Sequence, residues 1–186
     1  MKFLLIYLIW FTSLGCSNAQ TVAVPCEQKL TSLSWDSINE APAKDSLPKV
    51  YIFLSTECPL CRNVIATCNN LQQRYKCQWI GIIADKKTSN KSLKEFTKTY
   101  KPEFPLLIDK HAKWVTFFKA TITPEVFIIK NSKVVYAGAL DNRLSQPGQY
   151  RKVINEKYVE DVLQKLDHHL DFEPFCTTAI GCYIFP

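Results

Sequence analysis

The sequence predicts an α/β domain in which a central mixed β-sheet is flanked by helices. Three observations support this fold class: apolar strand-like runs alternate with amphipathic helical segments, two later runs form a hairpin, and a single helix follows them. A chain of 186 residues with 47% hydrophobic content can bury one sizeable core. We therefore expect one domain with terminal appendages.

The first elements of the core are a strand at 50–54 and a helix that starts at Pro59. Proline suits the first helical position because its missing N–H would be unpaired there anyway. The buried stripe predicted for this helix consists of Cys61, Val64, Ile65, Cys68, Leu71 and Tyr75. This arrangement places Cys58 at the helix N-cap and Cys61 one turn inside the helix.

The remaining elements continue the alternation. We expect a buried strand at 79–84, a helix at 89–100, a short strand at 104–108, a helix holding 114–118, hairpin strands at 126–129 and 133–137, and a last helix after Asn155. Ser92 and Glu95 have capping-box spacing, and Asp109 and Asn155 are candidate caps. Asn131-Ser132 is the predicted hairpin turn.

The chain ends differ from the core in composition. Residues 1–19 have the charged start, short apolar stretch and small residues of a signal peptide, with cleavage expected before Gln20. Alternatively, a loose lipobox would make Cys16 a lipid anchor. We expect 20–48 to be a lead-in with a short strand near 30–35, 49–170 to be the domain, and 171–186 to be an apolar tail packed on it. Export to the periplasm or cell envelope would place the cysteines in an oxidising compartment.

The motif Cys58-Pro59-Leu60-Cys61 is the predicted chemical centre. Unpaired N–H groups and the positive end of the helix dipole favour a thiolate at Cys58. Two thiols three residues apart can form and break a disulfide with little backbone movement. Zinc binding is the alternative, but the chain has no second C-x-x-C or C-x-x-H pair. We expect a redox-active Cys58–Cys61 disulfide, with no metal and no other cofactor.

Charge gives no sign of a nucleic-acid partner. The net charge of +6 is modest, and there is no Arg-rich or aromatic-interleaved stripe. A lysine cluster that supplies much of the charge is interpreted as the solvated face of a helix: Lys86, Lys87, Lys91, Lys94, Lys98 and Lys101.

Together with the dithiol and the Thr123-Pro124-Glu125-Val126-Phe127 segment, the order of elements resembles the thioredoxin-like superfamily. The chain is similar to its exported redoxin group, related to AhpC/TSA proteins, through pieces at 53–60, 104–109, 123–127, 138–142 and 181–184. The resemblance implies that Cys58 attacks a disulfide, that Cys61 resolves the mixed disulfide, and that Thr123, Pro124 and Pro59 position the substrate chain. It implies disulfide-bearing protein substrates and a membrane or periplasmic electron donor as partners.

Two alternatives within the same fold stay open. A peroxiredoxin-like peroxidase would use Cys58. Ser55 matches the Thr or Ser of that pattern, but Tyr51 stands in place of its Pro, and Thr123-Pro124 replaces an expected arginine. A copper-binding redoxin of the cytochrome oxidase assembly type would use Cys-x-x-x-Cys, which is one residue longer than the spacing here. In thioredoxin a buried acid precedes the first cysteine, and Ile52 stands in that place.

The other cysteines are predicted to be structural or auxiliary. Cys68 is expected to be a buried thiol on the helix stripe. In the tail, a Cys176–Cys182 bridge or a bridge from Cys26 to the tail is expected, because an exported chain oxidises exposed thiols. The resemblance also gives Cys182 a second candidate role, as a resolving thiol that lies near Cys58.

Overall fold

The computed structural model describes residues 26–30 and 47–185, so the predicted signal peptide, the Cys16 anchor and residues 31–35 of the predicted short strand lie outside the described residues. Leu30, where we expected that strand to begin, ends a helix instead. The helices are α1 (Cys26–Leu30), α2 (Pro59–Arg62), α3 (Ile65–Arg74), α4 (Asn90–Tyr100), α5 (Lys113–Phe118) and α6 (Tyr158–Asp167). The strands are β1 (Lys49–Leu54), β2 (Gln78–Ile83), β3 (Leu106–Ile108), β4 (Ile122–Thr123), β5 (Glu125–Lys130), β6 (Lys133–Gly138), β7 (Leu144–Gln146), β8 (Gln149–Tyr150), β9 (Phe175–Cys176) and β10 (Cys182–Tyr183). No helix within these described ranges has the length and apolar character needed to cross a bilayer.

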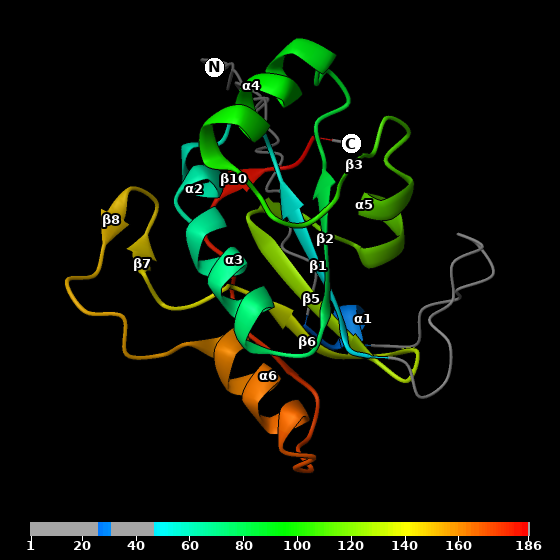
Figure 1. The fold of residues 1–186 in the computed structure, drawn as a ribbon, viewed down its shortest axis with the longest axis vertical. Helices are drawn as coiled ribbons and strands as arrows, with labels where there is room; N and C mark the ends of the chain where they lie inside the picture. The colour runs from blue at the N-terminus through cyan, green and yellow to red at the C-terminus, as the bar shows by residue number, and fades with distance from the viewer. Residues whose placement is uncertain (1–25, 31–46, 186) are drawn as a thin grey trace, which may run out of the picture.

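The main sheet has the strand order β3-β2-β1-β5-β6-β9 (Figure 1). Strand β1 pairs in parallel with β2, and β2 with β3, whereas β5 is antiparallel to both β1 and β6. The last strand, β9, returns from the tail and pairs in parallel with β6. The predicted mixed sheet is therefore confirmed. Two small sheets, β10-β4 and β7-β8, lie beside it.

Side chains of the central strand β1 enter two separate cores, one on each face of the sheet. Val50 and Ile52 belong to the core that is covered by α2, α3, α4 and α6. Tyr51 and Phe53 belong to the opposite core, which contains Phe118 of α5. All four β1 side chains are fully buried. This alternation across a doubly covered strand explains why its sequence is an unbroken apolar run.

The single helix predicted from Pro59 onward is wrong, because the structure has two helices there. The chain forms α2 and then α3, with Asn63 and Val64 between them. The guanidinium of Arg143 donates to the main-chain oxygen of Asn63 at 2.6 Å. A side chain inserted into the helical hydrogen-bond ladder commonly interrupts a helix. The ladder resumes where the N–H of Cys68 donates to Val64 at 3.0 Å.

Two predicted turn signals are confirmed. The carboxylate of Asp109 accepts from the N–H groups of Lys113 and Val115, each at 2.8 Å, and so caps the first turn of α5. The hairpin between β5 and β6 turns at Asn131 and Ser132, whose φ values are 50° and 63°. Positive φ at both central residues matches the twist that a two-residue hairpin needs.

Two predicted caps are wrong. The capping box of α4 is formed by Ser89 and Ser92, and not by Ser92 and Glu95, because the helix starts one turn earlier than that pair requires. Asn155 does not cap α6, because its side-chain oxygen accepts from Asn142 at 2.5 Å in the preceding loop.

The tail lies along the domain but does not cover all of its own apolar side chains. Phe172 and Phe175 pack against the first core, and Ile184 packs against the second. The rings of Tyr183 and Phe185, which we expected to be covered, are 56% and 81% exposed. Tyr183 is the second residue of strand β10, which pairs with β4, and Phe185 follows this strand.

Candidate active site

The dithiol lies where the central strand of the sheet leads into α2. Cys58 is the N-cap residue of α2, as predicted, and Pro59 is at the first helical position. The N–H of Cys61 donates to the main-chain oxygen of Cys58 at 3.1 Å. Both thiols are free, and both are almost completely buried, with exposed fractions of 1% and 0%.

The environment of Cys58 favours a thiolate. The thiol of Cys61, which donates to the Cys58 sulfur, is the main cause that lowers the pKa of Cys58 from 9.0 to about 5. Burial opposes this shift, while the thiol of Cys182 and the N–H groups of Cys61 and Leu60 add to it. The contribution of the helix N–H groups is as predicted. The neighbouring thiols lower the pKa more than these N–H groups do.

Cys61 has the opposite tendency. Burial, followed by the hydrogen bond and negative charge of Cys58, raises the pKa of Cys61 well above its ordinary value. The N–H of Ser55 donates to its sulfur at 3.3 Å. The pair therefore consists of one thiolate at the start of the helix and one protonated thiol beneath it.

The Thr123–Pro124 loop faces the dithiol, as the resemblance implied. The peptide bond between the two residues is cis. The main-chain oxygen of Thr123 lies 3.3 Å from the sulfur of Cys58 and accepts from it when that thiol is protonated. Thr123 is 1% exposed and ends β4, while Pro124 leads into the buried strand β5. The structure thus brings together Cys58, Cys61, Thr123 and Pro124.

The tail cysteines are used differently from the first expectation. Cys176 is disulfide-bonded, whereas Cys182 is a free thiol, so the predicted Cys176–Cys182 bridge is wrong. The strand registers explain this, because β9 places Cys176 against Ala137 and β10 places Cys182 against Thr123. The side chain of Cys26 lies outside the described part of the chain, and its bridge to the tail stays a prediction.

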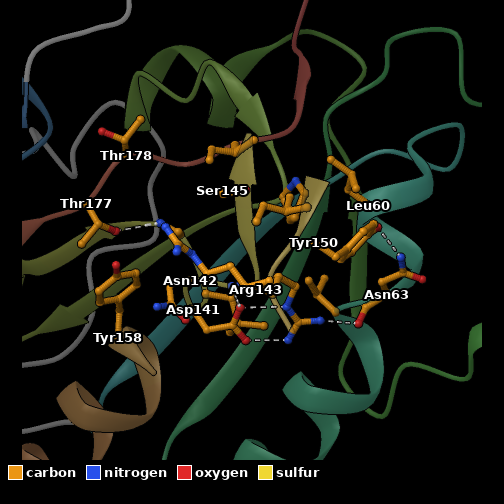
Figure 2. Close-up of a pocket in the computed structure, with 17 residues that line it drawn as sticks. Leu60, Asn63, Asp141, Asn142, Arg143, Ser145, Tyr150, Tyr158, Thr177 and Thr178 are labelled. Atoms are coloured by element: carbon orange, nitrogen blue, oxygen red, sulfur yellow. Dashed lines mark hydrogen bonds and ion pairs between the residues drawn. The ribbon is translucent and has the colours of Figure 1, made fainter. Parts of the chain in front are cut away.

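A cavity of about 300 Å³ opens beside the dithiol (Figure 2). Its wall joins five parts of the chain: α2, the cis-proline loop, the segment from β6 to β8, the start of α6, and the tail. Representative lining residues are Leu60, Pro124, Asn142, Tyr150 and Ile180. Leu60 lies between the two cysteines in the sequence, and Pro124 follows Thr123, whose main-chain oxygen contacts the Cys58 sulfur. A substrate polypeptide in this cavity would therefore lie next to the reactive sulfur.

One side of this cavity is formed by an ion pair between Arg143 and Asp141, which was not predicted from the sequence. Two nitrogens of the Arg143 guanidinium donate to the two carboxylate oxygens of Asp141, at 2.6 and 2.8 Å. The same guanidinium reaches Asn63 and the hydroxyl of Thr67, and Figure 2 shows it between α2 and the loop. In the sequence, Asp141 stood out only as part of the segment that resembles the family. The Asp-x-Arg spacing of Asp141 and Arg143, just after a predicted strand, could have indicated this ion pair.

Ser55 and Asp85 form a second polar contact near the site. The hydroxyl of Ser55 donates to Asp85 at 2.5 Å and accepts from the N–H of Glu57 at 3.1 Å. The half of the peroxidase pattern that Ser55 retains is therefore engaged with a carboxylate. In the part of the chain that the structure describes, no cluster of three or more His, Cys, Asp or Glu side chains could hold a metal ion. The copper alternative thus gains no ligand set there.

Known proteins are similar to this chain in part of its sequence or in its fold. The thiol-disulfide oxidoreductase ResA of Bacillus cereus is 34% identical over 85 residues, which are 45% of this chain and 49% of that protein, so the chain spans about half the length of the curated relative it matches. A hypothetical protein from Sinorhizobium meliloti has a structure with a TM-score of 0.63 at 20% identity, covering 75% of this chain and 80% of that one. An uncharacterized thioredoxin-like protein from Porphyromonas gingivalis has a TM-score of 0.50 at 18% identity, covering 68% and 79% of the two chains.

These likenesses confirm the thioredoxin-like fold. The family model described as the AhpC/TSA family matches residues 22–137, which is more than half of the chain and includes the dithiol and the cis-proline loop. This chain belongs to the AhpC/TSA family.

Proposed function

We propose that the protein is an exported thiol–disulfide oxidoreductase that exchanges disulfides with protein substrates through Cys58 and Cys61. The observation that carries the proposal is the pairing of a thiol of strongly lowered pKa, about 5, with a buried thiol of raised pKa at the start of one helix. The printed activity of the Bacillus cereus relative supports the same reaction class. Export rests on the signal-like segment at 1–19, and the lipid anchor at Cys16 stays a prediction.

In the first step, the thiolate of Cys58 attacks one sulfur of a substrate disulfide. A new S–S bond forms between Cys58 and that sulfur, the substrate S–S bond breaks, and the other substrate sulfur leaves as a thiolate. At neutral pH the Cys58 thiol is already ionised, because its pKa is about 5. No separate base is then needed for the attack.

In the second step, Cys61 releases the substrate. Once Cys58 is part of a mixed disulfide its negative charge is gone, so one cause that raises the pKa of Cys61 disappears. The N–H of Ser55 can then stabilise the Cys61 thiolate as it forms. Cys61 gives its proton to water and its sulfur attacks that of Cys58. The Cys58–Cys61 bond forms, the bond from Cys58 to the substrate breaks, and the second substrate sulfur leaves as a thiolate that takes up a proton. A membrane or periplasmic electron donor would restore the dithiol.

The cavity beside Leu60 and Pro124 is the place we assign to the substrate chain. It is partly apolar, and its mouth is bordered by the half-exposed ring of Tyr150, whose hydroxyl accepts from the side chain of Asn63 at 2.7 Å. A segment lying there would bring its disulfide close to Cys58, because Leu60 and Pro124 line the cavity and flank the dithiol. Thr123 and Pro59 border the same sulfur.

The test is reduction of insulin by the purified mature protein with dithiothreitol as electron source. Cys58→Ser should lower the rate at least about a hundredfold, because the attacking sulfur is lost. Cys61→Ser, mixed with insulin without dithiothreitol, should form a mixed disulfide with insulin at Cys58. Cys77→Ser is the matched control, since Cys77 is a free, half-buried thiol outside the site, and it should leave the rate unchanged. A near wild-type rate for Cys58→Ser would show that the assignment is wrong.

The second candidate function is reduction of hydroperoxides, in which the Cys58 sulfur would react with a peroxide in place of a disulfide. The retained Ser55 and the family membership are the observations in its favour. Rapid, stoichiometric consumption of hydrogen peroxide by the reduced protein, lost in Cys58→Ser and faster than insulin reduction, would replace the exchange function with peroxide reduction.

A further inference from the structure

We propose that Cys182 is a third redox thiol of the site, which can take the place of Cys61 by forming a Cys58–Cys182 disulfide that releases the substrate. This inference rests on the exchange function proposed above and adds a residue of the C-terminal tail to it. Four features of the structure support it.

The first feature is the position of β10. Its antiparallel register with β4 pairs Cys182 directly with Thr123. The main-chain oxygen of Thr123 lies 3.3 Å from the sulfur of Cys58, and the hydroxyl of Thr123 donates to the main-chain oxygen of Cys182 at 3.4 Å. One residue of the cis-proline loop therefore contacts both cysteines, which are far apart in the sequence. Figure 1 shows β10, in red, next to α2.

The second feature is a close approach that only glycine permits. A Cβ atom at Gly181 would lie 2.1 Å from the main-chain oxygen of Thr123, well inside any allowed contact. On the far side of Cys182, the N–H of Ile184 donates to the main-chain oxygen of Thr121 at 2.9 Å. The tail is thus fitted to the loop on both sides of the cysteine.

The third feature is direct contact between the thiols. The Cys182 thiol donates a hydrogen bond to the Cys58 sulfur. Burial and the charge of Cys58 raise the pKa of Cys182 to about 12, so it is a protonated donor in the resting site. When Cys58 enters a mixed disulfide, that charge is gone and Cys182 gives up its proton more readily. Cys182 is only partly buried, whereas Cys61 is fully buried, so its proton has a shorter way to solvent.

The fourth feature is access. Cys58 is 1% exposed, so a substrate disulfide reaches it only if part of its cover moves. Strand β10 has two residues and one partner strand, and such a short two-stranded sheet opens at little cost in free energy. Displacing β10 admits the substrate. The return of the same strand then brings Cys182 back to the substituted sulfur.

The step is balanced without any further oxidant. The Cys182 thiolate attacks the sulfur of Cys58, a Cys58–Cys182 bond forms, the bond from Cys58 to the substrate breaks, and the substrate leaves as a thiolate that takes up a proton. The two cysteines are oxidised by two electrons, and the substrate disulfide is reduced by two. Cys61 can then attack Cys58 and displace Cys182, which gives the Cys58–Cys61 disulfide and a free tail thiol.

The experiment uses variants in which Cys61 can no longer act. Reduced Cys61→Ser protein is mixed with oxidised glutathione, and the products are mapped by mass spectrometry under non-reducing conditions. We expect the glutathione adduct at Cys58 to decay into a Cys58–Cys182 disulfide. In Cys61→Ser/Cys182→Ala the adduct should last at least about tenfold longer, because the intramolecular thiol is gone. Cys61→Ser/Cys77→Ser is the matched control and should behave like Cys61→Ser.

The outcomes separate the inference from the function beneath it. An adduct that lasts equally long with and without Cys182, with no linked Cys58 and Cys182 peptides, would overturn the inference and leave disulfide exchange intact. Failure of Cys61→Ser/Cys182→Ala to form any adduct would overturn exchange through Cys58, and the role of Cys182 with it. The Cys61→Ser/Cys182→Ser protein repeats the measurement with a side chain of similar size and should also keep its adduct. Near-ultraviolet circular dichroism checks that each variant is folded.

Discussion

The two short strands of the tail, β9 and β10, carry one cysteine each and hold it in opposite chemical states. Strand β9 extends the main sheet beside β6, and its Cys176 is disulfide-bonded. Strand β10 pairs only with β4, and its Cys182 is a free thiol in contact with Cys58. One end of the tail is thus joined covalently to the protein, while the other end lies over the dithiol without a covalent bond.

The side chains around the two strands differ in the same way. At β9, the N–H of Thr177 donates to Ala137 at 3.0 Å, and its hydroxyl is 2.6 Å from that of Tyr136. At β10 and just after it, the side chains of Tyr183 and Phe185 are largely exposed. A fixed anchor limits how far the tail can travel, so a released β10 stays close to Cys58. From this difference we infer that β9 contributes to the stability of the fold, whereas β10 contributes Cys182 to the reaction at Cys58.

The largest effect should come from removing the anchor. Cys176→Ser should lower the free energy of unfolding by about 2 to 4 kcal/mol, which is the usual contribution of a disulfide. Cys182→Ser should lower it by less than about 1 kcal/mol, because a free, partly buried thiol is replaced by a group of similar size. Urea unfolding of the two variants measures both values. Equal losses would remove the distinction between the strands.

The same measurement tests the predicted partner of the anchor. If Cys26 forms the bridge to the tail, Cys26→Ser should match Cys176→Ser, and the double variant should be no less stable than either single variant. Additive losses from the two substitutions would show that Cys176 has another partner.

A smaller effect should follow from loosening β10 without touching a thiol. Gly181→Ala places a Cβ atom against the main-chain oxygen of Thr123, so β10 must move away from β4. We expect alkylation of Cys58 by iodoacetamide to become about tenfold faster, which corresponds to about 1.4 kcal/mol of easier opening. Tyr183→Ala, which removes an exposed ring from the same strand, is the control and should leave the rate unchanged. An unchanged rate in Gly181→Ala would mean that β10 does not limit access to Cys58.

The fold was largely predictable because its signals are local and repeated. The apolar run of β1, the Asp109 cap and the Asn131-Ser132 turn each depend on a few neighbouring residues, and the structure confirms all three. The interruption between α2 and α3 was not predictable from local pattern. It depends on Arg143, which reaches Asn63 from a loop far along the chain.

The site was predictable in part for the same reason. The N-cap position of Cys58 is visible in the sequence, because Pro59 marks the start of the helix. The contact of Cys58 with Cys182 was reached only through resemblance, because it depends on the register of a two-residue strand across a long sequence separation. A bridge within the tail was the simpler expectation from spacing. It failed because the sheet separates Cys176 from Cys182.

The smallest expected effect is on the titration of Cys58, and it compares the two thiols that donate to it. In the reduced wild-type protein, the ultraviolet absorbance of thiolate should show one step at pH about 5, because burial raises the pKa of Cys68, Cys77 and Cys182 above 9.0. Cys61→Ala should move this step upward most, since the Cys61 thiol is the largest cause of the lowered pKa. Cys182→Ala should move it upward by less, and Cys176→Ser should not move it.

The same shift sets the sign of a pH effect on stability. The folded-state pKa of Cys58 is below its unfolded value, so its contribution is fully present above pH about 9 and is lost as the pH falls toward about 5. Removing a thiol that donates to Cys58 raises the folded-state pKa of Cys58. The contribution of Cys58 to the free energy of unfolding then becomes smaller, because it is lost at a higher pH as the pH falls. The gain in unfolding free energy between pH about 5 and 9 should therefore be largest in the reduced wild type, smaller in Cys182→Ala and smallest in Cys61→Ala. If Cys182→Ala matched the wild type in both the titration and the stability profile, β10 would contribute nothing to the thiolate, and its cysteine would be no closer to the chemistry than that of β9.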